Sequence, residues 1–205
     1  MLTDLSIKDF MVQTASGTPV PGGGSIAALS ASLSASLAEM LASLTIGTKG
    51  YEKYEEEMKV NAKKAMSYRA KFIRDIDRDA DAYSQVMMAY KLPKNTDNEV
   101  SLRKQALQEA MEHACLVPLG VAFDTIEMME MIKIIVAKGN RNAITDGAVA
   151  TLMARSAVLS ALYNVQVNLI SIDDKIFVKK VTGQVKTLKE KATKLEQEII
   201  SKIDF

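Results

Sequence analysis

The residue of this chain best suited to proton-transfer chemistry is Asp79. If the surrounding segment is helical, Asp79 falls between Phe72, Ile76 and Tyr83, near the middle of an apolar face. A carboxylate in that position must find hydrogen-bond donors or a cation, or its pKa rises through desolvation. An acid with a pKa shifted in this way can act as a general acid–base. A structural salt bridge to an Arg or Lys of another helix is the alternative, and the pattern favours neither.

A second candidate site is a glycine-rich segment that precedes an apolar stretch. Glycine backbone can adopt positive φ and lie close against a ligand. A flexible cradle that opens onto a helix N-terminus can hold an anion or a polar ring, because the first-turn N–H groups lack partners. Ser25 would cap that helix. An ordinary loop and cap is the alternative, and the absence of a following Gly-Lys-Ser/Thr disfavours a Walker A phosphate site. The segment consists of Pro21, Gly22, Gly23, Gly24 and Ser25.

Three polar residues share one face of a later helix. Asp146 and Asn164 are five full turns apart, and Asn168 lies one turn further. Because Asp146 and Asn164 would be ~27 Å apart along the axis, they cannot contact the same small group. We therefore expect them to mark two ends of a groove, or sites that different copies of a dimer contribute. Hydrogen bonding between helices in the core is the alternative for both asparagines.

The remaining polar candidates are weaker. Asn140 and Arg141 supply amides and a guanidinium near the start of a helix, which suits a carboxylate or a polar heterocycle, although a capping loop explains them equally well. His113 and Cys115 are the only His and the only Cys, and two residues apart on a helix they point in different directions. We expect a structural role for both and no metal site.

Composition limits the class of protein. The chain has 205 residues, which suits one domain over 1–205 with a sizeable core. A net charge of +1 indicates no nucleic-acid partner. The single cysteine and the absence of a basic, then apolar N-terminal stretch favour a cytoplasmic setting. Residues 26–46 are apolar enough to suggest a membrane span, but Glu39 and the six serines from Ser25 to Ser43 favour a buried helix in a protein without membrane contact.

Hydrophobic periodicity predicts an all-α fold, a single-domain bundle of long helices. In the segment after the glycines, Ile26, Leu29, Leu33, Leu37, Met40 and Leu44 form one apolar stripe. Pro118 should kink or divide the fourth helix, and Gly139 should end it. The last helix carries a heptad seam, which packs on the chain's own body or on a partner copy. The expected helices cover 5–14, 26–46, 52–90, 99–138, 146–170 and the seam from Val181 to Ile199.

Taken together, these residues resemble the formiminotetrahydrofolate cyclodeaminase and methenyltetrahydrofolate cyclohydrolase family. The similarity covers nearly the whole chain from about Leu5, and no formiminotransferase half is present. Each piece is short, but the ordered set is specific. The matching pieces are residues 19–25, 38–40, 79–83, 92–94, 117–118, 139–140 with Asp146, and 164–165 with 168–169.

The resemblance implies an all-helical domain that forms a homodimer through its helices, with a folate pocket near the dimer interface. It implies no metal and no cofactor besides a tetrahydrofolate derivative as substrate. The family's catalytic acid corresponds to Asp79. The glycine-rich segment and the polar residues would line or support the pocket, and Arg141 or Lys94 would meet the glutamate tail of the folate. The implied pocket residues are Pro21, Gly22, Gly23, Gly24, Ser25, Asn140, Arg141, Asp146, Asn164 and Asn168.

The implied reaction is conversion of 5-formiminotetrahydrofolate to 5,10-methenyltetrahydrofolate and ammonia. The alternative is hydrolysis of 5,10-methenyltetrahydrofolate to 10-formyltetrahydrofolate, for which Asp79 would serve equally. Two further alternatives are a non-catalytic helical oligomerisation domain, in which Asp79 is salt-bridged, and a binding module for another carboxylated heterocycle.

Overall fold

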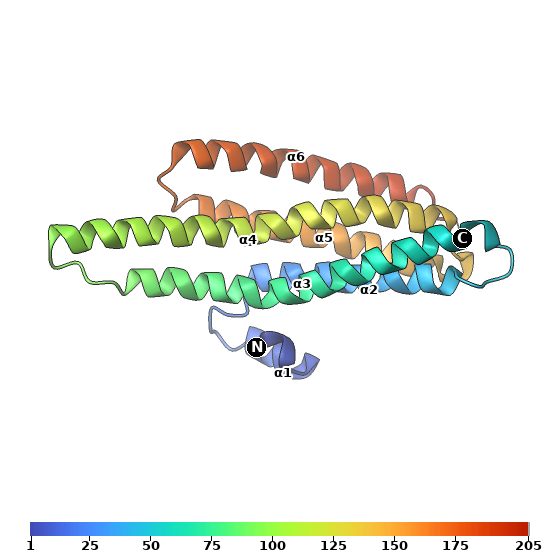
Figure 1. Cartoon of the computed structure of the whole chain (residues 1–205), viewed down its shortest axis with the longest axis horizontal. Coiled ribbons are helices and arrows are strands. Elements are labelled where there is room, and N and C mark those ends of the chain that lie inside the picture. The colour runs from blue at the N-terminus through green and yellow to red at the C-terminus, as the bar shows by residue number, and fades with distance from the viewer. Residues whose placement is uncertain (205) are drawn as a thin grey trace.

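Long antiparallel helices dominate the computed structural model, which describes residues 1–204 (Figure 1). That part of the chain contains no strand, so the all-α prediction is confirmed. Three short 3-10 helices, Leu2–Asp4, Glu52–Tyr54 and Arg141–Ala143, flank the longer elements. The helices are α1 Ile7–Thr14, α2 Gly23–Thr45, α3 Glu55–Tyr90, α4 Asp97–Lys138, α5 Ile144–Leu169 and α6 Lys175–Ile200.

The bundle is built around α2, α4 and α5. Helix α2 packs on α3 and α5, α4 packs on α3 and α5, and α6 covers α4 and α5. Helix α1 and the N-terminus are set apart from the bundle, next to the middle of α3 (Figure 1). Backbone and side-chain hydrogen bonds from Leu2 and Thr3 to Asp77, at 2.6 and 2.7 Å, attach this segment to α3.

Helix α2 buries its small side chains. Ala28, Ala31, Ala35 and Ala42 are fully buried, because alanine lets neighbouring helices approach closely. Of the larger apolar stripe that the periodicity identified, Leu29 and Leu37 are partly buried against the core, whereas the other members are exposed. Its most exposed members are Leu33 and Leu44, at 47% and 48%. Hydrophobic spacing identified the stripe, and residues 1–204 cover only part of it.

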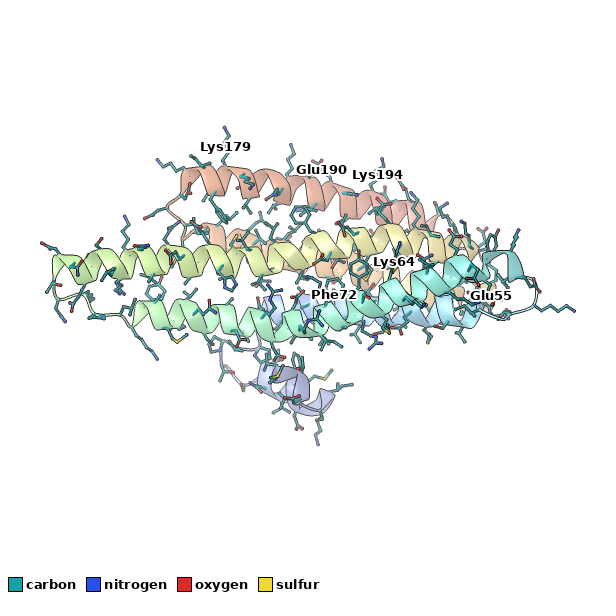
Figure 2. All side chains as sticks on the ribbon, in the orientation of Figure 1. Glu55, Lys64, Phe72, Lys179, Glu190 and Lys194 are labelled. Carbon is teal, nitrogen blue, oxygen red and sulfur yellow. The ribbon has the colours of Figure 1, made fainter. Side chains whose placement is uncertain are left out.

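Helix α3 is held to α4 by apolar packing and by a cluster of charges. Phe72, which points between the two helices in Figure 2, is fully buried. The Asp75 carboxylate, also buried, accepts hydrogen bonds from Lys71 at 3.0 Å and from Arg78 at 2.6 Å. Lys71 also pairs with Asp124 of α4. The negative charge of Asp75 is therefore neutralised one turn before Asp79.

One sequence expectation about α4 needs correction. Pro118 does not divide the helix, which runs unbroken from Asp97 to Lys138. Gly139 is the C-cap of α4, as expected, and its φ is −76°. A Cβ on Gly139 would lie 2.5 Å from the Ile135 carbonyl oxygen, so close approach of backbone is the reason for glycine there.

Helix α6 buries its heptad seam against the chain's own α4 and α5, which is one of the two outcomes that the sequence allowed. Its opposite face is charged: Lys179, Glu190 and Lys194 extend away from the bundle in Figure 2. The stripe of α2, and not the seam of α6, therefore leaves apolar side chains exposed.

Two helical segments, Gly23–Thr45 and Arg141–Leu169, are long and apolar enough to span a membrane by length and composition alone. About half of each apolar window lies buried inside the bundle, at 56% and 44%. Core helices of helical bundles share these properties.

Candidate functional site

A cavity of about 360 Å³ lies where the N-terminus of α2 meets α3, α4 and α5. Its walls combine glycine backbone, aromatic rings, two asparagines and a carboxyl group. The lining residues are Pro19, Val20, Gly22, Gly23, Gly24, Asp79, Tyr83, Val86, Tyr90, Met111, Ala114, Asn164, Val167, Asn168 and Ser171.

The glycines form the first turn of α2 and not a loop before it. Gly22 is the N-cap, and Ser25 is the third helical residue, so the prediction that Ser25 caps the helix is wrong. None of the three glycines has a positive φ. Close approach explains them instead. A Cβ on Gly24 would lie 2.5 Å from Asp79 Cγ, and one on Gly23 would lie 3.0 Å from Asn164 Nδ2. Glycine thus allows α2 to bring its N-terminus against α3 and α5.

Asp79 lies directly against this helix N-terminus. Its Oδ2 is 3.1 Å from the hydroxyl Oγ of Ser25. Burial raises the pKa of the Asp79 carboxyl above its ordinary value, although hydrogen bonds from the Ser25 hydroxyl and backbone N–H act in the opposite direction. The acid therefore holds its proton to higher pH than an exposed aspartate and can both accept and return one.

No cation lies within salt-bridge distance of Asp79 among residues 1–204. The structure thus disagrees with the salt-bridge alternative. In contrast, Asp75, on the same helix, carries two cations. Of these two carboxyl groups, the one that faces the cavity has no ion pair, so no cation opposes the rise of its pKa through desolvation.

Asn164 and Asn168 of α5 both reach this cavity. Asn164 Nδ2 donates to the Ser160 carbonyl at 2.9 Å, and Asn168 Nδ2 donates to the Ala114 carbonyl of α4 at 2.8 Å. The second bond is the interhelical contact that the sequence offered as an alternative. Because each amide nitrogen is engaged by a carbonyl, the side-chain oxygens are the groups that can accept hydrogen bonds from a ligand.

The other polar candidates lie at the opposite end of α2. Asn140 Nδ2 donates to the Leu44 carbonyl at 3.0 Å, and the Asn140 backbone N–H donates to Thr45 Oγ1 at 2.9 Å. Arg141 Nη1 donates to the Lys202 carbonyl at 3.3 Å. Asp146, half-buried, lies in the first turn of α5, where its charge complements the helix dipole. Within one protomer these residues do not join the cavity.

Two tyrosines of the cavity were not singled out as site residues from the sequence. Tyr83 and Tyr90 follow Asp79 on the same face of α3, at spacings of one and three turns. The Arg103 guanidinium lies 5.8 Å from the centre of the Tyr90 ring and donates to the Tyr90 carbonyl, which fixes this wall. The helical wheel that identified Asp79 included Tyr83, but only as one of its apolar neighbours.

Cys115 is buried, as a structural role requires, with its Sγ 3.9 Å from the Val165 carbonyl, whereas His113 is exposed. Burial raises the pKa of the Cys115 thiol to about 11, which keeps it protonated and unreactive. The structure groups no three His, Cys, Asp or Glu side chains in residues 1–204 as metal ligands.

Comparison with known proteins gives the same assignment for nearly the whole chain. The model of the formiminotransferase-cyclodeaminase family matches residues 6–187. The chain is 36% identical over 194 residues to a methenyltetrahydrofolate cyclohydrolase of Methylorubrum extorquens, covering 95% of this chain and 93% of that one. It is 31% identical over 191 residues to a formimidoyltransferase-cyclodeaminase of Rattus norvegicus, which matches 93% of this chain but only 35% of that longer protein.

A solved structure supports the fold. The formiminotetrahydrofolate cyclodeaminase of Thermotoga maritima superposes with a TM-score of 0.88 at 27% identity, over 99% of this chain and 98% of that one. Together with the family match, these similarities decide the classification: the chain belongs to the formiminotransferase-cyclodeaminase family.

Proposed function

We propose that the protein is a folate one-carbon enzyme, a 5-formiminotetrahydrofolate cyclodeaminase, with Asp79 as its catalytic acid–base. The observation that carries the proposal is a carboxyl group without an ion pair, held against a helix N-terminus in a cavity. The cavity volume of about 360 Å³ lies within the usual range of small-ligand sites. Flanking tyrosines and asparagine oxygens suit a polar aromatic ring such as a pterin.

The chemistry requires one group that takes a proton and returns it. In the cyclodeaminase reaction, N10 of the folate attacks the formimino carbon carried on N5, and the ionised Asp79 accepts the N10 proton. The protonated acid then donates to the departing nitrogen, which leaves as ammonia. Partial burial supports both proton transfers, the uptake from N10 and the donation to the departing nitrogen. It raises the pKa of Asp79 toward the range where proton uptake and release are balanced.

Hydrolysis of 5,10-methenyltetrahydrofolate to 10-formyltetrahydrofolate is the second candidate. The 36% identity with the Methylorubrum extorquens cyclohydrolase over almost the full length of both chains favours it. In that reaction Asp79 would accept a proton from the water that attacks the bridging carbon and return it when the ring opens. The acid–base residue is the same, so the site does not separate the two activities.

Near-ultraviolet absorbance of methenyltetrahydrofolate tests the proposal. Purified protein is added to 5-formiminotetrahydrofolate in one cuvette and to 5,10-methenyltetrahydrofolate in another, each beside an enzyme-free control. A rise in the first identifies the cyclodeaminase, and an accelerated fall in the second identifies the cyclohydrolase. No change in either cuvette would contradict the proposal.

A failed assay would bring two other readings forward. The first is a non-catalytic helical interaction domain, although its expectation of a salt-bridged Asp79 disagrees with the structure. The second is a binding module for another carboxylated heterocycle. Reduced folates would then fail to raise the melting temperature, since a ligand of the native state must stabilise it.

We further propose that the protein works as a homodimer that pairs through the exposed stripe of α2. Helix α2 carries a single charge, Glu39, which is bound to Arg69 at 2.8 Å, so the outward stripe is uncharged. Beside it, α1, α2 and α3 enclose an apolar hollow of about 700 Å³ that includes Phe10, Leu29 and Leu33. A second copy of the same surface would cover this area in a two-fold interface.

Leu33→Glu is expected to convert the dimer to a monomer, because it places a charge in the centre of the apolar stripe. Size-exclusion chromatography with light scattering measures the mass directly. Val60→Glu is the matched control, since Val60 is similarly exposed, at 52%, but lies on α3 away from the stripe. A dimer that survives Leu33→Glu would contradict this interface.

Antiparallel pairing of α2 helices would place the Asn140, Arg141 and Asp146 end of one protomer beside the cavity of its partner. We propose that these residues complete the partner's folate pocket, as the resemblance implies. Dimers that combine one Asp79→Asn protomer with one Arg141→Ala protomer would then contain one intact site.

Co-expression of the two variants is expected to restore about a quarter of wild-type activity, because about half of the dimers are mixed and each has one intact site of two. Each variant expressed alone provides the baseline. No recovery, or full activity of Arg141→Ala alone, would show that Arg141 belongs to no partner site.

We also propose that the protein is cytoplasmic, contacts neither a membrane nor nucleic acid, and uses no cofactor besides its folate substrate. The near-neutral net charge supports the absence of a nucleic-acid partner. The packing of α2 and α5 within the bundle supports the absence of a membrane span.

A further inference from the structure

The hydroxyl group of Ser25 has two possible acceptors and one proton. Its Oγ lies 3.0 Å from the Ile76 carbonyl oxygen and 3.1 Å from Asp79 Oδ2. A serine hydroxyl donates one hydrogen bond and accepts up to two. It can therefore donate to the carbonyl or to the carboxylate at one moment, but not to both.

The two arrangements correspond to the two protonation states of Asp79. When Asp79 is ionised, the hydroxyl donates to Oδ2, and the Ile76 carbonyl keeps the N–H donor that its own helix provides. When Asp79 carries a proton on Oδ2, that proton can be donated to Ser25 Oγ, and the hydroxyl turns to the Ile76 carbonyl. The Ser25 hydroxyl, Asp79 Oδ2 and the Ile76 carbonyl each have a partner in both states, and no heavy atom needs to move.

The Ser25 side chain contacts Asp79 and does not face the cavity. It is fully buried, at 0% exposure, and does not line the cavity, whereas Gly22, Gly23 and Gly24 do. The family resemblance implied that Ser25 is a pocket residue. In the structure its side chain reaches only α3, so any effect on the reaction must pass through Asp79.

We propose that Ser25 is a positioning residue whose hydroxyl reverses its hydrogen bond as Asp79 gains and loses its proton. This inference rests on the proposed function, because it gives the catalytic acid a partner for both halves of the reaction. The hydroxyl keeps its own proton throughout; only the direction of the hydrogen bond to Asp79 changes.

The surroundings leave Ser25 as the main polar influence on Asp79. From α2, no ionisable residue precedes Glu39. From α4 and α5 the cavity receives Met111, Ala114, Asn164, Val167 and Asn168, none of which titrates. On α3 itself, the charge of Asp75 is neutralised by Lys71 and Arg78. Besides Asp79, the titratable groups that α3 contributes to the cavity lining are Tyr83 and Tyr90.

Removing the hydroxyl should favour the protonated acid. A hydrogen bond to an ionised carboxylate is stronger than one between neutral groups, so its loss destabilises the ionised form more. Ser25→Ala is expected to move the acid limb of the kcat profile to higher pH by about half a unit to one unit. KM should change little, because Ser25 does not touch the substrate.

Ser34→Ala is the matched control. Ser34 lies on the same helix, is equally buried at 0% exposure, and donates to the Ala150 carbonyl at 2.7 Å, with no carboxylate nearby. This variant should lose stability without moving the acid limb. Ser25→Cys keeps a weak hydrogen-bond donor and should shift the acid limb by an intermediate amount. This variant replaces Ser25→Ala if Ser25→Ala folds poorly.

A direct titration separates this inference from the proposed function. Carbon-13 NMR of the labelled Asp79 carboxyl, assigned with Asp79→Asn, measures the pKa without turnover. A pKa that is higher in Ser25→Ala than in wild type and Ser34→Ala supports the inference even if neither folate is converted. An unchanged pKa of Asp79 in Ser25→Ala overturns it, even if wild-type protein is fully active on folate.

Discussion

Asp79→Asn is expected to lower kcat by about 10²–10⁴-fold, the range that a positioned general acid–base contributes. Asparagine has nearly the same shape and can still accept from the Ser25 hydroxyl, but it can neither take nor return a proton. Folate binding should therefore survive, and KM should stay within a few-fold of wild type. Steady-state kinetics on both 5-formimino- and 5,10-methenyltetrahydrofolate measure the change.

The control for this variant is Asp81→Asn. Asp81 lies two residues further along α3, is exposed, and does not line the cavity. Its removal changes the charge of the helix by the same amount and should leave kcat unchanged. Full activity in Asp79→Asn, or an equal loss in both variants, would remove Asp79 from the catalytic role.

Asp79→Asn should also change the stability of the protein. A salt-bridged aspartate stabilises the folded state when it is ionised, whereas Asp79 destabilises it when ionised. Burial raises the pKa of Asp79 in the folded protein, so the folded state binds this proton more tightly than the unfolded chain does. The bound proton of Asp79 stabilises the folded state fully at pH values below the unfolded-state pKa. This stabilisation is lost as pH rises through the folded-state pKa. Above that pH, a partly buried ionised carboxylate remains as a cost.

Asp79→Asn should therefore raise the Tm relative to wild type at pH values above the folded-state pKa, and this difference should shrink as pH falls toward the ordinary aspartate value of 3.8. Thermal unfolding followed by circular dichroism across that range measures it. A large loss of Tm at neutral pH would instead indicate that the Asp79 charge is structurally stabilising.

Gly24→Ala is expected to abolish most activity as well, for a steric reason. The added Cβ would lie 2.5 Å from Asp79 Cγ and 2.7 Å from Oδ2, closer than nonbonded atoms can approach. Either the carboxyl group must leave its position or α2 must move away from α3. A displacement of about 1 Å at a reacting group costs on the order of 10²-fold in rate.

Alanine substitutions at other glycines test whether the steric contact with Asp79 causes the loss of activity. At Gly23 the added Cβ would be 3.0 Å from Asn164 Nδ2, a side chain that can adjust, so a smaller loss of activity is expected. Gly120 and Gly183 are helical with open space around the new methyl group, and alanine there should raise helix stability by up to about 1 kcal/mol. Equal activity in the Gly24 and Gly120 variants would show that this contact does not constrain the site.

Local sequence information predicted the helices, the candidate acid and the buried seam of α6, but not the buried face of every helix. Helix α2 illustrates the limit. Periodicity identified the stripe from Ile26 to Leu44 correctly, yet its alanine face is the one that enters the core. Packing of helices at short distance favours small side chains, and a hydrophobic scale ranks them below leucine. The pattern therefore contains two apolar faces and does not say which is internal.

The site shows a similar division. Asp79 could be identified because one acid among apolar neighbours breaks a helical pattern, and residues 22–24 because three glycines are conspicuous. The reason for the glycines could not be found in the same way, since close approach depends on α3 and α5, which lie far along the chain. Equally, spacing placed Asp146 and Asn164 on one face of α5 but could not show that only Asn164 reaches the cavity of its own protomer.

The most direct test of the account is a crystal structure of the Asp79→Asn variant with 5-formiminotetrahydrofolate, which this variant should bind without converting. We expect the folate in the cavity at the N-terminus of α2, with N10 within hydrogen-bonding reach, about 3 Å, of the side chain at position 79. Folate bound elsewhere, or with N10 facing away from that side chain, would contradict the assignment of Asp79 as the acid–base.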